Sequence, residues 1–303
     1  MKQSQDGQIE KNYLLQEENI KNHALYKDDR LFHIHNQNCL GYKIASFPLN
    51  VLSPFFDTEK TWLTVGDYNG LEANYLQQRN QKVVASDLSD ALLKEAHNEG
   101  LVKEYSKQNV EHLTYENNAF DYLICKEAFH HFPKAYYAIY EMLRVSNSAV
   151  ILLQEPIDII AKMPLLLLIK NVLDRINPLL INKIWKNRFS FEVVGNYIFK
   201  ISEREIEKIA MGIGLPCVAF LGQNLFRSDK KKIEGMSDVP LNQKGWNQVK
   251  RDIAIRDFFC KLEIIPYSSL TCVMFKVPPS EKMRKEMKQL GFTIIDLPKN
   301  PYL

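Results

Sequence analysis

The amino-acid sequence predicts an α/β fold in which helices cover both faces of a parallel sheet. From residue 61 onward, short apolar segments alternate with helix-forming segments, which is the pattern of βαβ units. One of these segments, SAVILLQ at 148–154, is apolar without interruption, as expected of a strand buried on both faces. Of the 303 residues, 46% are hydrophobic and 25% are charged, which is ordinary for a globular protein with a substantial core.

The predicted elements follow one another in chain order. Residues 1–8 are expected to be disordered, residues 9–28 to form a polar helix, and residues 30–57 to be apolar and rich in loops. The strands expected next are 61–66, 81–87, 103–110, 119–125, 148–154, 217–221 and 270–277. The helices expected between the first five of them are LEANYLQQR at 71–79, a helix that starts at Ser89 and ends at Gly100, and a helix opened by Pro133.

The second half of the chain contains two insertions, at 157–200 and 222–265, where the alternation of strands and helices breaks. The helix between them starts with Ser202 and Glu205 in the S-x-x-E pattern of a capping box. A last helix ends at Gly291, before the segment FTIIDL. These boundaries divide the chain into an N-terminal helical or lid segment (1–57), a core (58–156) and a second half with the insertions and the last strands (157–303).

Cysteine usage and charge exclude several classes of protein. The five cysteines are an odd number, widely spaced and without a C-x-x-C motif. Neither a disulfide framework nor a zinc site is therefore expected, and a reducing compartment, the cytoplasm, is favoured. Lys and Arg exceed Asp and Glu by 39 − 36 = 3, which gives no general affinity for nucleic acid. His33 and His35 lack further ligands, so no metal site is predicted.

Hydropathy predicts neither a transmembrane helix nor a signal peptide, because no apolar span reaches 18 residues and the N-terminus is polar. The leucine-rich stretch 163–185 leaves three interpretations open: a packed helical pair or lid, the face of a homodimer, or a helix at a membrane surface. Lys230, Lys231 and Lys232 are expected to lie in a solvated loop, because no nucleic-acid recognition pattern accompanies them.

The turn after the first strand indicates a ligand that contains a ribose. Gly66 and Gly70 allow the backbone to approach a ligand, and in such sheets ligands bind at the carboxyl ends of the strands. Asp87 ends the second strand, 87 − 66 = 21 residues after the first glycine, where a carboxylate suits the two hydroxyls of a ribose. The alternative is that the glycines only form a tight turn and Asp87 caps the next helix. The absence of G-x-G-x-x-G disfavours a nicotinamide-dependent oxidoreductase.

Three further segments belong to the same sequence pattern as the first turn and Asp87. They are Asn109-Val110-Glu111-His112-Leu113, Asn118-Ala119-Phe120-Asp121-Tyr122 and His130-His131-Phe132. In order and spacing, residues 60–156 resemble the class I S-adenosylmethionine (SAM)-dependent methyltransferases of the ubiquinone/menaquinone-methyltransferase-like kind (methyltransferase domain type 11). The resemblance implies a Rossmann-like seven-stranded sheet with helices on both faces, an N-terminal helical cap, and insertions after strand 5 and before the last strand.

The resemblance also implies SAM as the cofactor and assigns residues to its site. The implied cofactor-binding residues are Gly66, Asp67, Gly70, Asp87, Leu88, Asn109 and Val110. In the family pattern, Asp87 holds the ribose, Leu88 packs on the adenine, and Asn109 stands where an acid usually faces the adenine amino group. Thr64 replaces the acid usual before the first glycine, and Tyr68 replaces the middle glycine. These departures leave open a catalytically inactive, methyltransferase-like binding module.

Candidates for the chemistry follow the fourth strand. Alignment of an acceptor with a methyl donor contributes on the order of 7–11 kcal/mol, and a base for a hydroxyl acceptor adds about 10²–10⁴-fold. Glu127, His130 and His131 are the predicted catalytic residues, Glu155 is a further candidate, and a structural role is the alternative for the histidines. The predicted function is methyl transfer to a small or carrier-linked acceptor, preferably a hydroxyl of a sugar-like compound. Carbon methylation of a quinone-like ring is the alternative.

Overall fold

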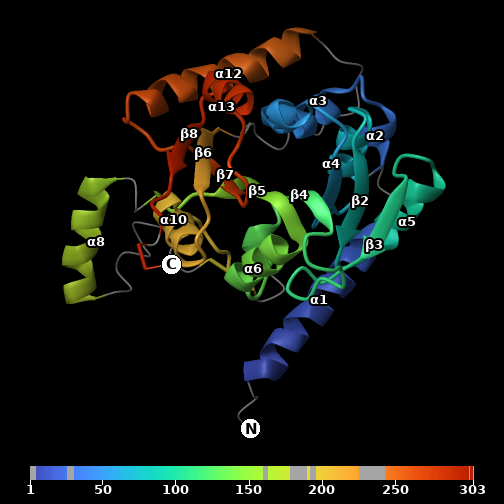
Figure 1. Cartoon of the computed structure of the whole chain (residues 1–303), viewed down its shortest axis with the longest axis horizontal. Helices are drawn as coiled ribbons and strands as arrows, with labels where there is room; N and C mark the ends of the chain where they lie inside the picture. Colours follow the sequence, from blue (N-terminus) through green and yellow to red (C-terminus); the bar gives the residue numbers. More distant parts are fainter. Residues whose placement is uncertain are drawn as a thin grey trace.

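The protein is an α/β structure built on one mixed sheet, which Figure 1 shows in a computed structural model. The structure describes residues 5–25, 31–159, 163–177, 190–191, 196–224, 243–299 and 301–302. The lysines at 230–232 and the second half of the leucine-rich stretch 163–185 lie outside these residues. Among the described helices, none combines the length and the apolar character that a membrane crossing requires.

Eight strands form the sheet in the order β3-β2-β1-β4-β5-β7-β6-β8. The strands are β1 (Thr61–Val65), β2 (Lys82–Asp87), β3 (Glu104–Lys107), β4 (Phe120–Lys126), β5 (Ser146–Pro156), β6 (Cys217–Gln223), β7 (Ser269–Phe275) and β8 (Thr293–Asp296). β1 to β5 pair in parallel, while β7 runs antiparallel to both of its neighbours, β5 and β6. The α/β class is confirmed, and FTIIDL adds an eighth strand at the edge, paired antiparallel with β6.

The helices are α1 (Gln5–Leu25), α2 (Phe32–His35), α3 (Leu40–Ser46), the 3-10 helix η1 (Phe47–Phe55), α4 (Leu71–Gln77), α5 (Ala91–Asn98), the 3-10 turn η2 (Phe129–His131), α6 (Ala135–Val145), α8 (Pro164–Ile176), α10 (Glu203–Gly212), α12 (Gln243–Lys261) and α13 (Glu281–Gln289). Two hydrophobic clusters fill the space between helices and sheet. One cluster joins α3, η1, α4, α5 and α13 to one face, and the other joins α6 and α10 to the opposite face. Helices therefore cover both faces, as expected.

Successive strand residues alternate between these two clusters. Trp62 and Tyr122 belong to the first cluster, whereas Leu63 and Leu123, their neighbours in the chain, belong to the second. This is the period of two that a strand imposes on its side chains, with both faces buried. Because apolar residues occupy both sets of positions, the core strands can be recognised in the sequence as continuous apolar runs.

The N-terminal region is more helical than the sequence suggests. α1 begins at Gln5, inside the segment expected to be disordered, and residues 30–57 form α2, α3 and η1 instead of loops. Local capping explains part of this difference. The Cys39 sulfur accepts a hydrogen bond from Tyr42 N at the start of α3, and Pro48 occupies the first turn of η1, where its missing N–H costs nothing. The predicted capping box of Ser202 and Glu205 is confirmed at the start of α10.

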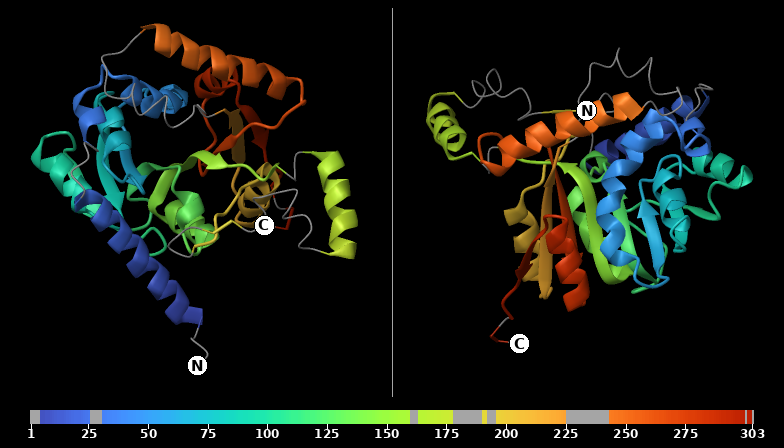
Figure 2. Two further views of the ribbon diagram at one scale, coloured as in Figure 1. Left: turned by 180° about the vertical axis from the view of Figure 1, so that it is seen from behind. Right: turned by 90° about the horizontal axis from the view of Figure 1, so that it is seen from above.

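Three helices lie outside the two covering layers. In the right-hand view of Figure 2, α12 crosses above one end of the sheet, and α8 stands apart from the sheet to one side. α8 exposes large apolar side chains, among them Leu165 (68% exposed) and Ile176 (71%). α1 extends from the region of β3 and α5, as both figures show. α1 and α12 thus lie near the strand ends, which are the places where this fold binds ligands.

Candidate active site

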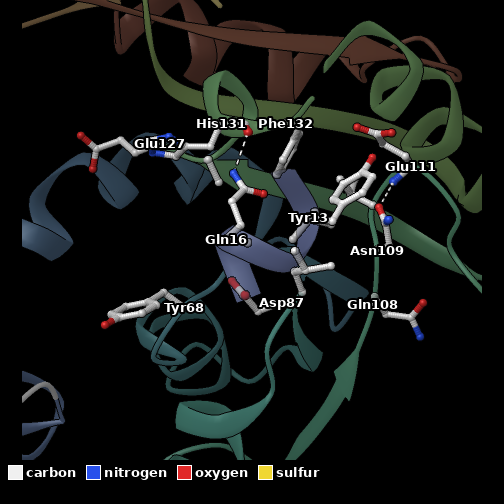
Figure 3. Close-up of a pocket in the computed structure, with 15 residues that line it drawn as sticks. Tyr13, Gln16, Tyr68, Asp87, Gln108, Asn109, Glu111, Glu127, His131 and Phe132 are labelled. Carbon is white, nitrogen blue, oxygen red and sulfur yellow. Dashed lines mark hydrogen bonds between the residues drawn. The ribbon is translucent and has the colours of Figure 1, made fainter. Parts of the chain in front are cut away.

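A cavity of about 300 Å³ lies at the carboxyl ends of β1, β2, β3 and β4. Figure 3 shows the side chains around it, which come from the four strand ends and from α1. The lining residues are Tyr13, Gln16, Val65, Gly66, Tyr68, Asp87, Leu88, Gln108, Asn109, Val110, Glu111, Glu127, Ala128, His131 and Phe132. Of the ten residues predicted for the site, the cavity brings together Gly66, Asp87, Leu88, Asn109, Val110, Glu127 and His131. Asp67, Gly70 and His130 do not line it.

Gly66 allows the turn after β1 to approach the loop after β4. Its φ is +68°, and a Cβ on it would lie 2.5 Å from the Cβ of Ala128. Gly70 has a φ of +81° at the N-terminus of α4, where a Cβ would lie 2.4 Å from Val102 Cγ2. Gly66 therefore shapes the cavity wall directly, whereas Gly70 serves the packing of the turn behind it.

Asp67 is buried behind the cavity and holds the turn together. Its Oδ2 accepts hydrogen bonds from the Thr64 hydroxyl (2.8 Å) and from Ala73 N (2.9 Å), and its Oδ1 accepts one from Glu72 N (3.2 Å). Burial, and then the neighbouring Glu72 carboxylate, raise the pKa of Asp67 well above its usual value. Thr64, which stands where an acid is usual, thus takes part in fixing the first turn of α4.

Asp87 faces the cavity from the end of β2, with Leu88 beside it. Its Oδ1 accepts a hydrogen bond from Ser89 N (3.0 Å), and within the described residues no side chain donates to this carboxylate. Burial raises the pKa of Asp87 to about 6, although the backbone N–H groups of Ser89 and Leu88 oppose the shift. The N-cap position of α5 is Asp90, so Asp87 does not cap that helix, and the alternative interpretation is wrong on this point. Asp87 forms the turn after β2 through its hydrogen bond with Ser89 N, and it lines the cavity.

The residues that follow β3 form the part of the cavity wall that lies across from Asp87, and they carry polar side chains. Asn109 Oδ1 accepts from Glu111 N (2.9 Å), and Glu111 Oε1 accepts from Lys134 N (2.6 Å). Glu111 is completely buried, and its Oε2 has no hydrogen-bond partner within the described residues. The Tyr13 ring of α1 lies beside Glu111 in Figure 3. Burial and then the Glu111 carboxylate raise the pKa of Tyr13 above its usual value.

α1 closes the cavity from outside the sheet. Gln16 Nε2 donates to the backbone oxygen of His131 over 2.8 Å, a contact drawn in Figure 3. The next residue of the helix, Glu17, forms an ion pair with Lys107 of β3. The helix therefore bridges the ends of β3 and β4, which lie on opposite sides of the cavity.

Glu127 stands at the end of β4 with a φ of +50°, which side-chain-bearing residues rarely adopt. Its carboxylate lies 3.2 Å from Lys126 Nζ, which also contacts Glu72 over 3.1 Å. Burial alone would lower the pKa of Lys126, but the charges of Glu72 and Glu127 more than offset burial and raise it. Glu127 lines the first cavity and also a second one of about 390 Å³ between η1, β5, β6 and α12. Glu127 is thus a residue in a strained conformation that contributes to the walls of both cavities.

His130 and Glu155 form a buried pair beside this site. The Glu155 carboxylate, fully buried, accepts from His130 Nδ1 (2.7 Å) and from the backbone N–H groups of Ala128 (3.0 Å) and Phe129 (3.0 Å). Glu155 thereby fixes the turn after β4, which is a structural role for both Glu155 and His130. The His131 ring lines the cavity, with its centroid 3.9 Å from that of His130.

Sequence reasoning missed several lining residues. Gln16 sits in a polar helix without any motif, and nothing in the sequence indicates which strand that helix covers. Gln108 and Phe132 directly flank predicted residues, so the expectation that a whole strand end lines the cavity would have included them. No group of three or more His, Cys, Asp or Glu side chains that could hold a metal occurs in the described ranges.

Comparison with known proteins found one family model and several solved structures that are similar to this chain. Residues 63–153 match the family model described as a methyltransferase domain. Solved structures similar to the chain include a SAM-dependent methyltransferase from Thermotoga maritima, at 15% identity and TM-score 0.47, covering 88% of this chain and 100% of that one. Another is magnesium protoporphyrin IX methyltransferase from Synechocystis with bound S-adenosylhomocysteine (SAH), at 17% identity and TM-score 0.41, covering 61% and 78%. A third is a SAM-dependent methyltransferase from Aquifex aeolicus, at 20% identity and TM-score 0.33, covering 39% and 69%. No curated protein matches the chain.

Proposed function

We propose that this chain, whose residues 63–153 match a methyltransferase domain, is a SAM-dependent enzyme that methylates a hydroxyl group of a small or carrier-linked acceptor. In this proposal the segment 1–57 closes the cofactor site, 58–156 binds the cofactor, and 157–303 contributes the acceptor side. The observation that supports it best is the position of Glu127, a residue that lines both the first cavity and a second one.

The residues of the first cavity fit SAM. Asp87 offers a carboxylate to which no described side chain donates, and the two ribose hydroxyls supply such donors. The buried Glu111 Oε2, which lacks a partner within the described part of the chain, suits the amino group of an adenine. Leu88 and Val110 would pack on the adenine faces, and Gly66 leaves room for the remainder of the molecule. Asp67 and Gly70 would act indirectly, by holding the turn.

The chemistry requires a methyl donor, an acceptor oxygen and a base. When bound, SAM supplies a methyl group whose bond to sulfur breaks, with its electron pair going to sulfur, as the acceptor oxygen forms its bond to carbon. Glu127 takes the hydroxyl proton in this proposal, because it is an ionisable residue that lines both cavities. His131 orients the acceptor, while His130 and Glu155 position His131 through the ring contact and the fixed turn.

Carbon methylation of a quinone-like ring is the second candidate. The walls of the second cavity are mainly apolar, which suits a ring whose carbon atom accepts the methyl group. A carboxylate base at Glu127 would serve such a ring as well, by removing the proton of a ring hydroxyl.

The expected surroundings of the enzyme complete the proposal. The five cysteines are free and buried, which agrees with a reducing compartment such as the cytoplasm. The partner is a small molecule, with no nucleic acid. The exposed apolar residues of α8 are the surface that a homodimer or a membrane surface would cover, and sedimentation with and without vesicles distinguishes these two.

Thermal unfolding with ligands tests the cofactor. A ligand at 100 times its dissociation constant adds about 2.7 kcal/mol to the free energy of unfolding. SAM and SAH should each raise the melting temperature, and NAD should not. Asp87→Ala should abolish the shift, whereas the control Asp90→Ala should keep it, because Asp90 makes no side-chain capping bond. A shift with NAD but with neither sulfur compound contradicts the proposal.

Turnover tests the base. Once an acceptor is identified, Glu127→Gln should lower the rate of SAH formation by about 10²–10⁴-fold, because the amide cannot take a proton. The SAH-induced thermal shift should remain in this variant. An unchanged rate assigns the base to another residue.

A further inference from the structure

The second cavity lies beside the first at the same edge of the sheet. Its walls come from α3, η1, β5, β6 and α12, and Glu127 is the residue that it shares with the first cavity. α12 forms its outer side, consistent with its position across the end of the sheet in Figure 2. A molecule in this cavity would therefore contact a residue that also belongs to the wall of the first cavity.

Gln154 is the most informative residue of this cavity. It is 3% exposed and lines the cavity, yet within the described residues its side-chain amide makes no hydrogen bond. A φ of +59° and a register shift between Leu152 and Glu155 in the β5–β7 pairing interrupt the strand here. Such irregularities re-aim side chains next to active sites. The Gln154 amide is not one of the fully buried, unpartnered polar groups of the described residues, so a polar group of a ligand in the cavity can reach it.

The side chains that line the cavity indicate what the non-polar part of the ligand is like. Most of the lining side chains are apolar, including Val51, Leu221 and Val249. Two rings, Phe47 and Trp246, meet edge to face with centroids 5.4 Å apart. Aromatic side chains and mainly apolar walls favour an aromatic ring over a sugar, whose many hydroxyls would lose their hydrogen bonds to water.

The charges of the cavity specify the polar group. Its ionisable lining residues are Glu127 and Asp257, both carboxylates. Lys250 Nζ lies 6.0 Å from the centroid of the Trp246 ring without lining the cavity. A carboxylate or phosphate on the ligand would face two like charges. Both carboxylates already have partners, because Glu127 pairs with Lys126 and Asp257 Oδ1 accepts from Asn224 over 2.8 Å. A cationic ligand is therefore not required for charge balance.

We infer that this cavity binds the methyl acceptor and that the acceptor is an uncharged, flat aromatic compound with a ring hydroxyl. This inference rests on the proposed function and narrows its substrate class. Gln154 holds the hydroxyl or a neighbouring ring oxygen, and Trp246 contacts the ring. Glu127 takes the hydroxyl proton, the oxygen forms its bond to the methyl carbon, and the methyl–sulfur bond breaks with its electron pair going to sulfur.

A shape-matched series of probes tests the inference. Equilibrium dialysis of the SAH-bound enzyme would compare 1-naphthol, 1-naphthoate, 1-naphthylmethylamine and glucose. We expect 1-naphthol to bind at least tenfold more tightly than the other three, and SAM with 1-naphthol to yield SAH. Tighter binding of the carboxylate, the amine or glucose, or no binding of the naphthol, overturns the inference.

Matched variants locate the binding. Gln154→Leu should weaken naphthol binding about tenfold, and Trp246→Ala should weaken it tenfold or more. Phe258→Ala is the control, because Phe258 lies on the same helix, α12, but is 59% exposed and outside the cavity. An effect of the control equal to that of Trp246→Ala, or no effect of either cavity variant, also overturns the inference.

The two proposals fail separately. If SAH binds, if Asp87→Ala abolishes this binding, and if 1-naphthol does not bind more tightly than the other probes, the proposed function is retained. The inference of an aromatic acceptor is then wrong. If SAH does not bind, the proposed function itself falls.

Discussion

At the scale of single residues, the Asp87 carboxyl group determines how SAH binding should depend on pH. Burial raises its pKa to about 6, and ribose hydroxyls donate to the ionised form. A proton therefore competes with the ligand, so the dissociation constant should stay constant above about pH 7. Below about pH 6 it should rise, approaching tenfold per pH unit. Titration calorimetry between pH 4.5 and 8 measures this dependence.

The control for this experiment is Asp87→Asn, which keeps the shape of the side chain and removes its titration. Binding to this variant should be weak at every pH and should not change between pH 5 and 7. A wild-type dissociation constant that is equally flat would show that the ribose is held elsewhere.

Gly66 offers a second prediction at this scale. In Gly66→Ala the new methyl group meets Ala128, and a φ of +68° is unfavourable for alanine. We expect a loss of about 1–3 kcal/mol in the free energy of unfolding, measured in urea, together with loss of SAH binding. Adding Ala128→Gly removes the clash but not the backbone strain, so the double variant should recover part of the stability. No recovery would show that the contact with Ala128 is not the cause.

The site residues that can be predicted from the sequence are those whose position follows from the end of a strand. Gly66, Asp87 and Asn109 each follow a strand at a spacing that the parallel sheet converts into proximity. Glu155 differs, because its role depends on the turn after the neighbouring strand, which its carboxylate holds by four hydrogen bonds. Spacing along the chain does not reveal which turn a buried carboxylate will stabilise.

At the scale of elements, α1 is the helix whose position no motif indicates. Its hydrogen bond from Gln16 to the His131 backbone oxygen and its ion pair with Lys107 hold it across the cavity. Gln16→Ala should therefore speed SAH dissociation roughly two- to tenfold, the worth of one hydrogen bond. Stopped-flow displacement measures the rate. Glu10→Ala is the control, because Glu10 is an exposed residue of the same helix.

An effect of Glu10→Ala as large as that of Gln16→Ala would mean that general helix stability, not the contact with His131, governs dissociation. Equal rates in all three proteins would show that α1 does not retain the ligand.

Helices and strands with a clear pattern of apolar residues are predicted well from the sequence. Elements that depend on tertiary contacts are not. β1, β2, β4 and β5 follow apolar runs, and the helix start at Ser202 follows a side-chain cap. η1 contains Pro48 and Pro54 and has no helical period, so the sequence indicates a loop. It is ordered because its apolar side chains pack into the core, as the burial of Leu49, Leu52 and Phe55 shows.

At the scale of the whole molecule, one continuous sheet joins the segment 58–156 to the segment 157–303. β5, the last strand of the core segment, pairs with β7, which pairs with β6. The hydrophobic cluster on one face includes Trp62 from the first half and Phe275 from the second. Phe55 stacks on Phe275 with centroids 6.3 Å apart and an angle of 10°. The two cavities thus share one rigid edge, which suits the alignment of a donor with an acceptor.

This continuity predicts that the core does not fold without the second half. A fragment of residues 1–156 would expose β5 as an unpaired edge and would leave Phe55 and Trp62 without Phe275 near them. We expect the full chain to unfold in urea in one transition, with circular dichroism and tryptophan fluorescence coinciding. The fragment should show no cooperative transition and no SAH binding. Two separate transitions in the full chain, or a fragment that binds SAH as tightly as the whole protein, would contradict this, because the cofactor half would then be an independent domain.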